Sequence, residues 1–223
     1  MADLARVALV SSSWAKLAAT DLLWTGLCDR EWRGRHVADV CRAQRDIQPR
    51  AALRRSLAEA RVSCISKQEL CRLEWSFRFK RFAGAEWFGS DPWWLGEPAR
   101  TLRFVADGTV RWSEREWDGL MRWKLEGGSI LRVKHRELGA FPGERLVRHP
   151  TNWGFIFISP WVVYCSFPLV RATDDKHVSD RSLARHIQPW QWREAKEYNV
   201  EPADGDSDSN GDGDEGPPEF PGW

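Results

Sequence analysis

Tryptophan is the residue type that most constrains this chain, because the sequence holds fifteen tryptophans and only two tyrosines. A tryptophan side chain buries a large area, and its indole N–H needs a hydrogen-bond partner once it is buried. So many indoles predict a thick aromatic core, a stacking surface, or both. Hydrophobic residues make up 42% of the chain and charged residues 29%, which predicts a soluble protein with a sizeable core.

The spacing of the apolar residues changes at Trp75. Aromatic and polar residues alternate over 75–80, which predicts a strand with one buried face. Two hairpins are expected next, one with a type I′ turn at Asp107-Gly108 and one turning at Gly127-Gly128. The apolar runs 155–158 and 161–164 predict two more strands. Six or seven antiparallel strands of this kind fit a β-barrel or a β-sandwich.

The segment before this β region has helical periodicity. Residues 3–33 predict two helices, with Thr20 or Asp21 capping the second. Residues 34–74 are also helical in pattern and basic, are interrupted by Pro49, and contain a capping box that begins at Ser66. The fold class expected is therefore α+β, with N-terminal helices packed on an antiparallel β-barrel or sandwich.

The C-terminal end differs in composition. Residues 201–223 hold eight acidic residues and no Lys or Arg, and their Gly, Asp, Ser and Pro content predicts disorder. A helix at 190–195 is expected to pack back on the sheet. The remaining chain has nine more basic than acidic residues, which could attract nucleic acid or an acidic partner. These basic residues are spread out, so we favour a solvated surface and regard nucleic acid as unlikely.

Several function classes find no support in the sequence. The five cysteines are scattered and none lies in a CxxC, which argues against a metal centre and favours a reducing compartment. No stretch is apolar enough to cross a bilayer and no secretory signal is evident, so we expect an intracellular protein without a membrane partner. No nucleophile or P-loop motif is present, and Cys165 is expected to be a buried, inert thiol. We expect no enzymatic activity and no cofactor.

The first thirty residues carry a resemblance to a known family. Val10-Ser11 followed by Trp14, and then Leu23-Trp24 followed by Leu27, resemble the V-S-x-x-W and L-W-x-x-L motifs in the second half of an F-box. An F-box normally begins further upstream, with a helix that contains L-P. The resemblance implies docking onto the Skp1-type linker protein of a cullin–RING ubiquitin ligase. Residues carried over as F-box core or Skp1 surface are Leu4, Val7, Val10, Trp14, Leu22, Trp24 and Leu27.

With the resemblance included, the chain divides into four regions. We expect partial F-box-like helices over 1–33, a helical linker over 34–74, a Trp-rich β domain with a C-terminal helix over 75–200, and a disordered acidic tail over 201–223. The resemblance implies a substrate-recognition adaptor of an SCF-type ubiquitin ligase that binds a target protein through the β domain. The alternative is a stand-alone β-barrel that binds a ligand or a protein.

The aromatic cluster between the first strand and the first hairpin is the candidate target-binding segment. Trp87, Phe88, Trp93 and Trp94 could act as recognition anchors, or their rings could plug the open end of the barrel. Arg78 and Lys80 are expected on the outward face of the first strand, where they could favour an acidic target or form a solvated face. A small-molecule ligand is unlikely, because large inward-facing aromatics fill a small barrel.

Overall fold

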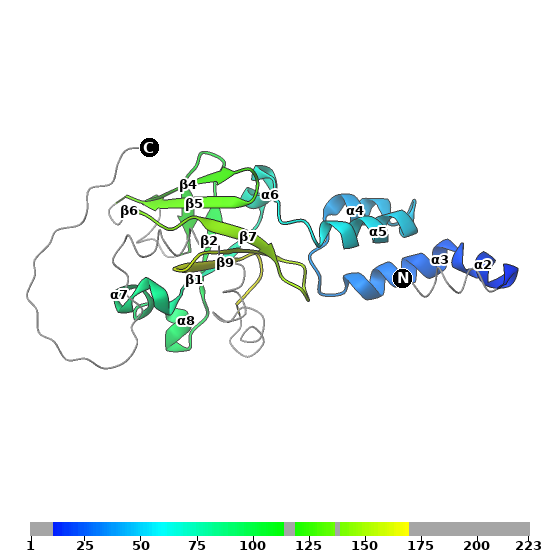
Figure 1. Cartoon of the computed structure of the whole chain (residues 1–223), viewed down its shortest axis with the longest axis horizontal. Helices are drawn as coiled ribbons and strands as arrows, with labels where there is room; N and C mark the ends of the chain where they lie inside the picture. The colour runs from blue at the N-terminus through cyan, green and yellow to red at the C-terminus, as the bar shows by residue number, and fades with distance from the viewer. Residues whose placement is uncertain (1–10, 114–118, 137–138, 170–223) are drawn as a thin grey trace, which may run out of the picture. The chain divides into compact units, whose positions relative to one another are not determined.

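The structure is a computed structural model, and it describes residues 11–113, 119–136 and 139–169 (Figure 1). The chain forms two compact units. Of the described residues, the first unit comprises 11–62 together with 148–154, and the second comprises the rest. The predictions for Leu4, Val7, Val10, the helix at 190–195 and the disordered tail lie outside the described residues.

The first unit is helical. Its described helices are α2 (Ser12–Ala18), α3 (Asp21–Trp32), α4 (Asp39–Gln44) and α5 (Pro49–Glu59). The prediction of N-terminal helices is confirmed over the described part of that segment. Thr20 precedes α3, but its hydroxyl donates to the carbonyl of Lys16 at 3.2 Å rather than capping α3. Pro49 begins α5, a position where its missing N–H costs no helical hydrogen bond.

The second unit contains short helices and one antiparallel sheet. Its helices are α6 (Lys67–Arg72), the 3₁₀ helix η1 (Arg81–Ala83), α7 (Ala85–Phe88) and α8 (Pro92–Leu95). Ser66 caps α6 by accepting from the N–H of Glu69 at 3.1 Å, as predicted. The described strands are β1 (Trp75–Phe79), β2 (Arg100–Phe104), β3 (Val110–Trp112), β4 (Met121–Glu126), β5 (Ile130–His135), β6 (Gly139–Ala140), β7 (Glu144–Arg148), β8 (Phe155–Ile158) and β9 (Val162–Cys165).

The strand order makes the sheet a nearly closed barrel. Neighbouring strands run β3-β2-β1-β9-β8-β7-β5-β4, with β6 paired to β5. The two end strands approach each other, because Thr109 forms an isolated bridge with Arg122 and the N–H of Trp123 donates to the carbonyl of Gly108 at 2.9 Å. The structure therefore selects the barrel over the sandwich. It also has more strands in its described residues than the six or seven expected, since β6 and β7 were not predicted.

The two predicted hairpins are present, but one turn differs in type. β2 pairs with β3, and β4 pairs with β5 around Gly127-Gly128. At the first turn the N–H of Gly108 donates to the carbonyl of Val105, and Gly108 has a φ of 87°. A type I′ turn needs positive φ at both central residues, and Asp107 does not have it. The turn instead places only glycine in the left-handed region, so the type I′ prediction is wrong.

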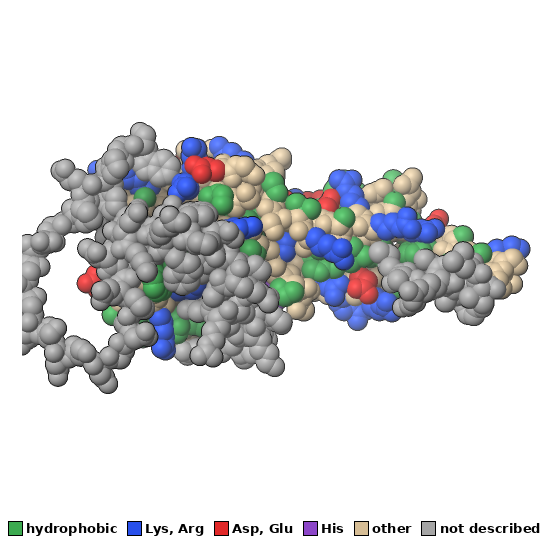
Figure 2. All heavy atoms as spheres, viewed as in Figure 1, with side chains coloured by type: hydrophobic (Ala, Val, Ile, Leu, Met, Phe, Trp, Pro, Cys, Tyr) green, Lys and Arg blue, Asp and Glu red, His purple; other side chains and the backbone are tan. Residues whose placement is uncertain are grey.

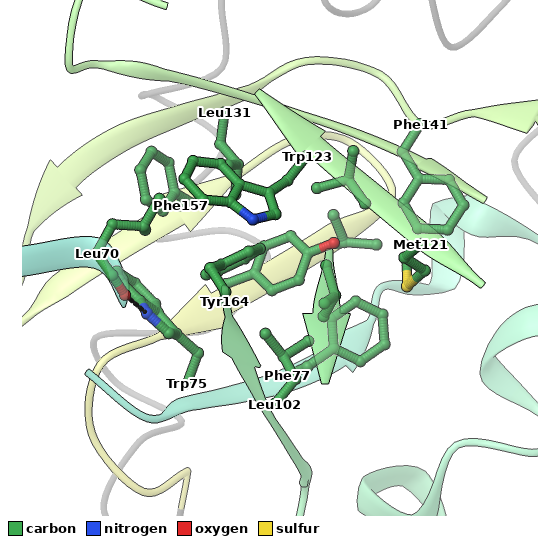
Figure 3. Close-up of a cluster of buried hydrophobic side chains, with 14 of the residues drawn as sticks. Leu70, Trp75, Phe77, Leu102, Met121, Trp123, Leu131, Phe141, Phe157 and Tyr164 are labelled. Carbon is green, nitrogen blue, oxygen red and sulfur yellow. Dashed lines mark hydrogen bonds between the residues drawn. The ribbon is translucent and has the colours of Figure 1, made fainter. Parts of the chain in front are cut away.

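Aromatic side chains fill the barrel interior. Rings from Trp75 and Phe77 on β1, Trp123 on β4 and Tyr164 on β9 point toward one another there (Figure 3). The Phe77 and Tyr164 ring centroids are 4.9 Å apart. The indole N–H of Trp75 donates to the carbonyl of Leu70 at 3.0 Å, which satisfies the donor that burial would otherwise leave unpaired. The predicted thick aromatic core is this interior.

Candidate partner-binding surfaces

Helix α3, which contains much of the F-box-like segment, turns one face into the core of the helical unit. Trp24, Cys28 and Trp32 recur every four residues and are all buried. Residues at this spacing lie above one another on an α-helix. They pack with residues of α4, α5 and the loops, namely Val37, Cys41, Ala52, Leu53 and Trp153. Helix α3 is thus part of a core that extends well beyond the first thirty residues.

Both buried indoles of α3 have partners for their N–H groups. Trp24 Nε1 donates to the carbonyl of Ala18 at 2.7 Å, which connects α3 to the end of α2. Trp32 Nε1 donates to Ser56 Oγ on α5 at 2.8 Å. A buried indole N–H without an acceptor costs free energy, so these two bonds fix the rotation of α3 about its axis.

Residues 148–154, which connect β7 to β8, complete the helical unit. The Arg148 guanidinium donates to the backbone carbonyls of Val62 at 3.2 Å, Glu59 at 3.3 Å and Trp153 at 2.8 Å. The Arg35 guanidinium lies over the Trp153 ring, 4.5 Å from its centroid. A sequence-distant loop therefore holds the end of the helical segment in place.

The two buried thiols of this unit, Cys28 and Cys41, are in environments that disfavour the thiolate form. Burial, reinforced by the neighbouring Glu59 carboxylate, raises the pKa of Cys41 to about 12. Burial also raises the pKa of Cys28, against the opposing effect of Arg45. The thiolate is the nucleophilic form of cysteine, so neither side chain is suited to nucleophilic chemistry near neutral pH.

The opposite side of α3 exposes large apolar side chains. Leu22 is 80% exposed and Leu23 is 39% exposed. Ile47, between α4 and α5, is 76% exposed and lines a depression of about 660 Å³. Asp21, Arg50 and Arg54 also line this depression. Basic side chains gather over α4 and α5 (Figure 2). Exposed apolar side chains that a partner can cover are one feature of protein-binding surfaces.

The F-box-like residues therefore have different places in the structure. Leu22 is exposed, Trp24 is in the core, and Leu27 is partly buried against that core. Trp14 lies in α2, and its side chain is outside the described part. Sequence analysis named Leu23 only as part of the L-W-x-x-L motif, and it did not name Ile47. The signal that could have found Ile47 is an isolated β-branched apolar residue two positions before Pro49, the proline that begins α5.

In the second unit, the aromatic cluster divides between two faces of the sheet. The Trp87 ring packs against Phe79 at 5.0 Å, Phe141 at 5.7 Å and Trp161 at 6.2 Å between centroids. Phe88 also packs against the barrel core. These contacts fit the expectation that rings of this segment plug one end of the barrel.

Trp93 and Trp94 lie instead on the outer side of β1. Trp94 Nε1 donates to the carbonyl of Phe79 at 2.8 Å, and the Arg78 guanidinium lies 4.5 Å from the Trp93 centroid. Trp93 packs with apolar residues of β8 and β9, including Ile158 and Val163. Helix α8 therefore covers the outer face of the β1–β9–β8 part of the sheet.

This cover corrects the expectation for Arg78 and Lys80. Both were expected on an outward, solvated face, and both are buried. The physical reason is that β1 is covered on both faces: the barrel core packs on one side and α8 on the other. Alternating aromatic and polar residues therefore did not mark a half-exposed strand. The continuous apolar runs of β8 and β9, beside β1, were the signal for two buried faces.

Asp91 holds α8 in this position. Its carboxylate accepts from the N–H of Phe79 at 2.6 Å and from the N–H of Trp93 at 3.0 Å. Burial raises the pKa of Asp91 above the usual value for aspartate, and the two N–H groups oppose that shift. Asp91 thus acts as a helix cap that also binds β1.

The fold and these surfaces define a two-part protein: a helical segment with exposed apolar residues, joined to a filled antiparallel barrel. Residues 1–30 match a family model described as F-box-like. The resemblance drawn from the two sequence motifs is therefore confirmed, and the chain carries an F-box-like segment. Comparison with curated proteins and with solved structures gave no match.

No group of three or more His, Cys, Asp or Glu side chains in residues 11–113, 119–136 and 139–169 is placed to hold a metal ion. Among the helices that the structure describes, none is both long and apolar enough to cross a membrane.

Proposed function

We propose that this protein is a substrate-recognition adaptor of an SCF-type ubiquitin ligase. In this role the F-box-like segment binds a Skp1-type linker protein, the β unit binds the target, and the ligase complex supplies the chemistry. Such a protein acts inside the cell and catalyses no reaction itself. The observation that carries the proposal is the F-box-like match together with the exposure of Leu22 on α3.

The geometry of α3 supports two roles for its residues, one in the core of the helical unit and one in contact with a partner. Trp24 and Trp32 build the core, whereas Leu22 points away from it and is available to a partner. Exposed leucines cost little in the free chain, but they gain the free energy of apolar burial when a partner covers them. The depression beside Ile47 would extend the apolar contact beyond the F-box-like segment.

The filled barrel interior favours a protein target over a small molecule. Buried aromatic and aliphatic side chains occupy the interior (Figure 3). A ligand would have to displace them, and close-packed cores resist such changes. The target would therefore bind on the outside of the β unit.

The test is binding of the full chain to a purified Skp1-type linker protein, measured by calorimetry. Leu22→Asp should lower the affinity at least tenfold, because it places a carboxylate in the apolar contact. The matched control is Leu95→Asp, the same change at a leucine of the β unit that is 66% exposed. Absence of linker binding by the unmodified chain, or equal losses in both variants, would rule the proposal out.

A further inference from the structure

The outer face of β4 and β5 places like charges directly opposite each other. Arg122 faces Lys134, and Lys124 faces Arg132, in the register of the hairpin. These four side chains, called here the cationic face, line a depression of about 300 Å³ together with Trp123. Like charges directly opposite one another destabilise an antiparallel pair. The hairpin thus carries a repulsion that a bound anion would relieve.

Glu126 offsets only one end of this face. Its carboxylate lies 3.4 Å from Lys124 Nζ and 3.2 Å from Arg132 Nε, at the end of β4. The Arg122–Lys134 pair lies two residues further from Glu126 than the Lys124–Arg132 pair. Strands β4 and β5 therefore carry one carboxylate, that of Glu126, against the four basic side chains of the cationic face.

The positive charge continues onto the next hairpin. Arg103 on β2 faces Arg111 on β3, a further like-charge pair. The pKa of Asp107, in the turn of that hairpin, is lowered first by hydrogen bonds from Thr109 and then by the guanidinium groups of Arg122 and Arg111. The isolated bridge between Thr109 and Arg122 places the cationic face next to this hairpin.

The chain contains a segment of complementary charge. Residues 201–219 hold eight carboxylates and no basic residue. Residues 170–200 connect this segment to the end of the described barrel, and fully extended they span at most roughly 100 Å. A domain of about 100 residues has a radius of gyration near 13 Å. The acidic segment can therefore reach any face of the β unit.

We propose that residues 201–219 bind the cationic face of their own chain and act as a removable anionic cover. An acidic segment of a partner protein would then have to displace this cover to reach the same surface. The inference goes beyond the proposed adaptor role and does not depend on linker binding, because it concerns only the β unit and the acidic segment.

The expected strength is modest, as suits a cover that can be displaced. The Lys124 side chain is 63% exposed, and ion pairs at such sites contribute little individually and are screened by salt. Attachment to the same chain raises the local concentration of the acidic segment, which compensates for weak individual contacts. The contact should therefore be present at low salt and should decrease steeply as salt is added.

The first test is zero-length crosslinking of the full chain with a water-soluble carbodiimide. The reagent activates a carboxylate, the Lys amine attacks it, and an amide forms while the carbodiimide leaves as a urea. We expect peptides that join Lys124 or Lys134 to the acidic segment, in the monomer fraction. Their yield should fall at least threefold in 1 M NaCl, where the Debye length is about 3 Å.

The controls distinguish this occupant from others. Residues 114–118 connect β3 to β4 and contain Glu114, Glu116 and Asp118, so a variant with these three changed to amides should leave the crosslinks in place. Lys16, in the helical unit, should give far fewer crosslinks to the acidic segment. Crosslinks only to residues 114–118 or Glu126, only between two chains, or equally to Lys16 would overturn the inference.

The second test measures competition with a fluorescein-labelled octaglutamate peptide by anisotropy. A full-length variant with all eight tail acids changed to amides should bind this probe at least fivefold more tightly than the unmodified chain. Adding Lys124→Glu and Lys134→Glu to that variant should remove the binding. If the unmodified chain and the variant with eight tail amides bound the octaglutamate probe with equal affinity, the acidic segment would not cover the cationic face. The tail positions are Glu201, Asp204, Asp206, Asp208, Asp212, Asp214, Glu215 and Glu219.

Discussion

Trp32 and Ser56 are joined by a buried hydrogen bond in which the indole N–H donates to the serine hydroxyl oxygen at 2.8 Å. The hydroxyl in turn donates to the carbonyl of Leu53 at 2.9 Å. This chain of bonds connects the end of α3 to the interior of α5, so the F-box-like helix depends on residues outside its own segment.

Ser56→Ala should destabilise the helical unit by about 1–3 kcal/mol, because it leaves the Trp32 N–H buried without an acceptor. Urea unfolding followed by circular dichroism would measure the change. The double variant with Trp32→Phe removes the donor as well, and its cost should be smaller than the sum of the two single changes. Additive effects of the two substitutions would show that the bond contributes nothing.

Gly128→Ala should destabilise the β unit by about 2–3 kcal/mol. Gly128 has a φ of 70°, a conformation that costs an L-residue roughly 1–2 kcal/mol, and an added Cβ would contact Cys64 Sγ and lie 3.1 Å from the carbonyl oxygen of Ile65. The control is Gly127→Ala, which has a φ of 55° but meets only Ser129 Oγ at 4.0 Å. Tryptophan fluorescence during urea unfolding would compare them. Equal losses at both glycines would show that the close approach to Ile65 is unimportant.

Asp91→Asn should destabilise the β unit, because an amide can accept only one of the two N–H groups that the carboxylate accepts. Burial raises the folded-state pKa of Asp91, so the folded chain holds its proton more tightly than the unfolded chain. The contribution of this proton to stability is full below the unfolded pKa and is lost as the pH rises through the folded pKa.

The measurement is the free energy of unfolding of both proteins from about pH 2.5 to pH 7, a range that extends below and above the ordinary pKa of aspartate. The advantage of the unmodified chain should shrink as the pH rises. Asp107→Asn is the matched control of opposite sign, since hydrogen bonds from Thr109 lower the pKa of Asp107. The unmodified chain should become more stable relative to the Asp107→Asn variant as the pH rises. If the stability differences at the two sites changed with pH in the same direction, both assignments would be contradicted.

Iodoacetamide should modify the cysteines in order of exposure. Cys64 is exposed, whereas Cys28, Cys41 and Cys165 are buried. At about pH 8 the pKa of Cys41, raised to about 12, leaves almost no thiolate. Mass spectrometry after brief labelling of the native chain should find Cys64 modified and the three buried thiols intact. Early modification of Cys41 would mean that the helical unit opens readily.

The sequence predicted local elements better than the faces that they bury. Periodicity and turn residues predicted the helix of α3, the capping by Ser66, the hairpins, and strands at 155–158 and 161–164, the last of which lies at 162–165 in the structure. The burial of Arg78 does not, because it depends on α8 folding over the outer side of β1. Likewise, β7 lacks a clean period of two: Glu144, Leu146 and Val147 are all buried.

The candidate partner-binding surface could be predicted from the sequence only in the segment that contains the two F-box-like motifs. The two F-box-like motifs identified the segment, but they could not separate the exposed Leu22 from the buried Trp24. That separation depends on which face of α3 meets α5. The cationic face depends on strand register, which pairs Arg122 with Lys134 across a turn and is invisible in the spacing of either strand alone.

The insertion of residues 148–154 into the helical unit sets an order of events during synthesis. The carbonyls of Glu59 and Val62 can accept from the Arg148 guanidinium only after the ribosome has added Arg148, which follows most of the barrel strands in the sequence. The helical unit is synthesised first but gains its last packing residues late. A nascent chain that stops short of residue 154 has an incomplete helical core. A complete helical core would then require a chain made through residue 154, when β8 and β9 are the described strands still to be added.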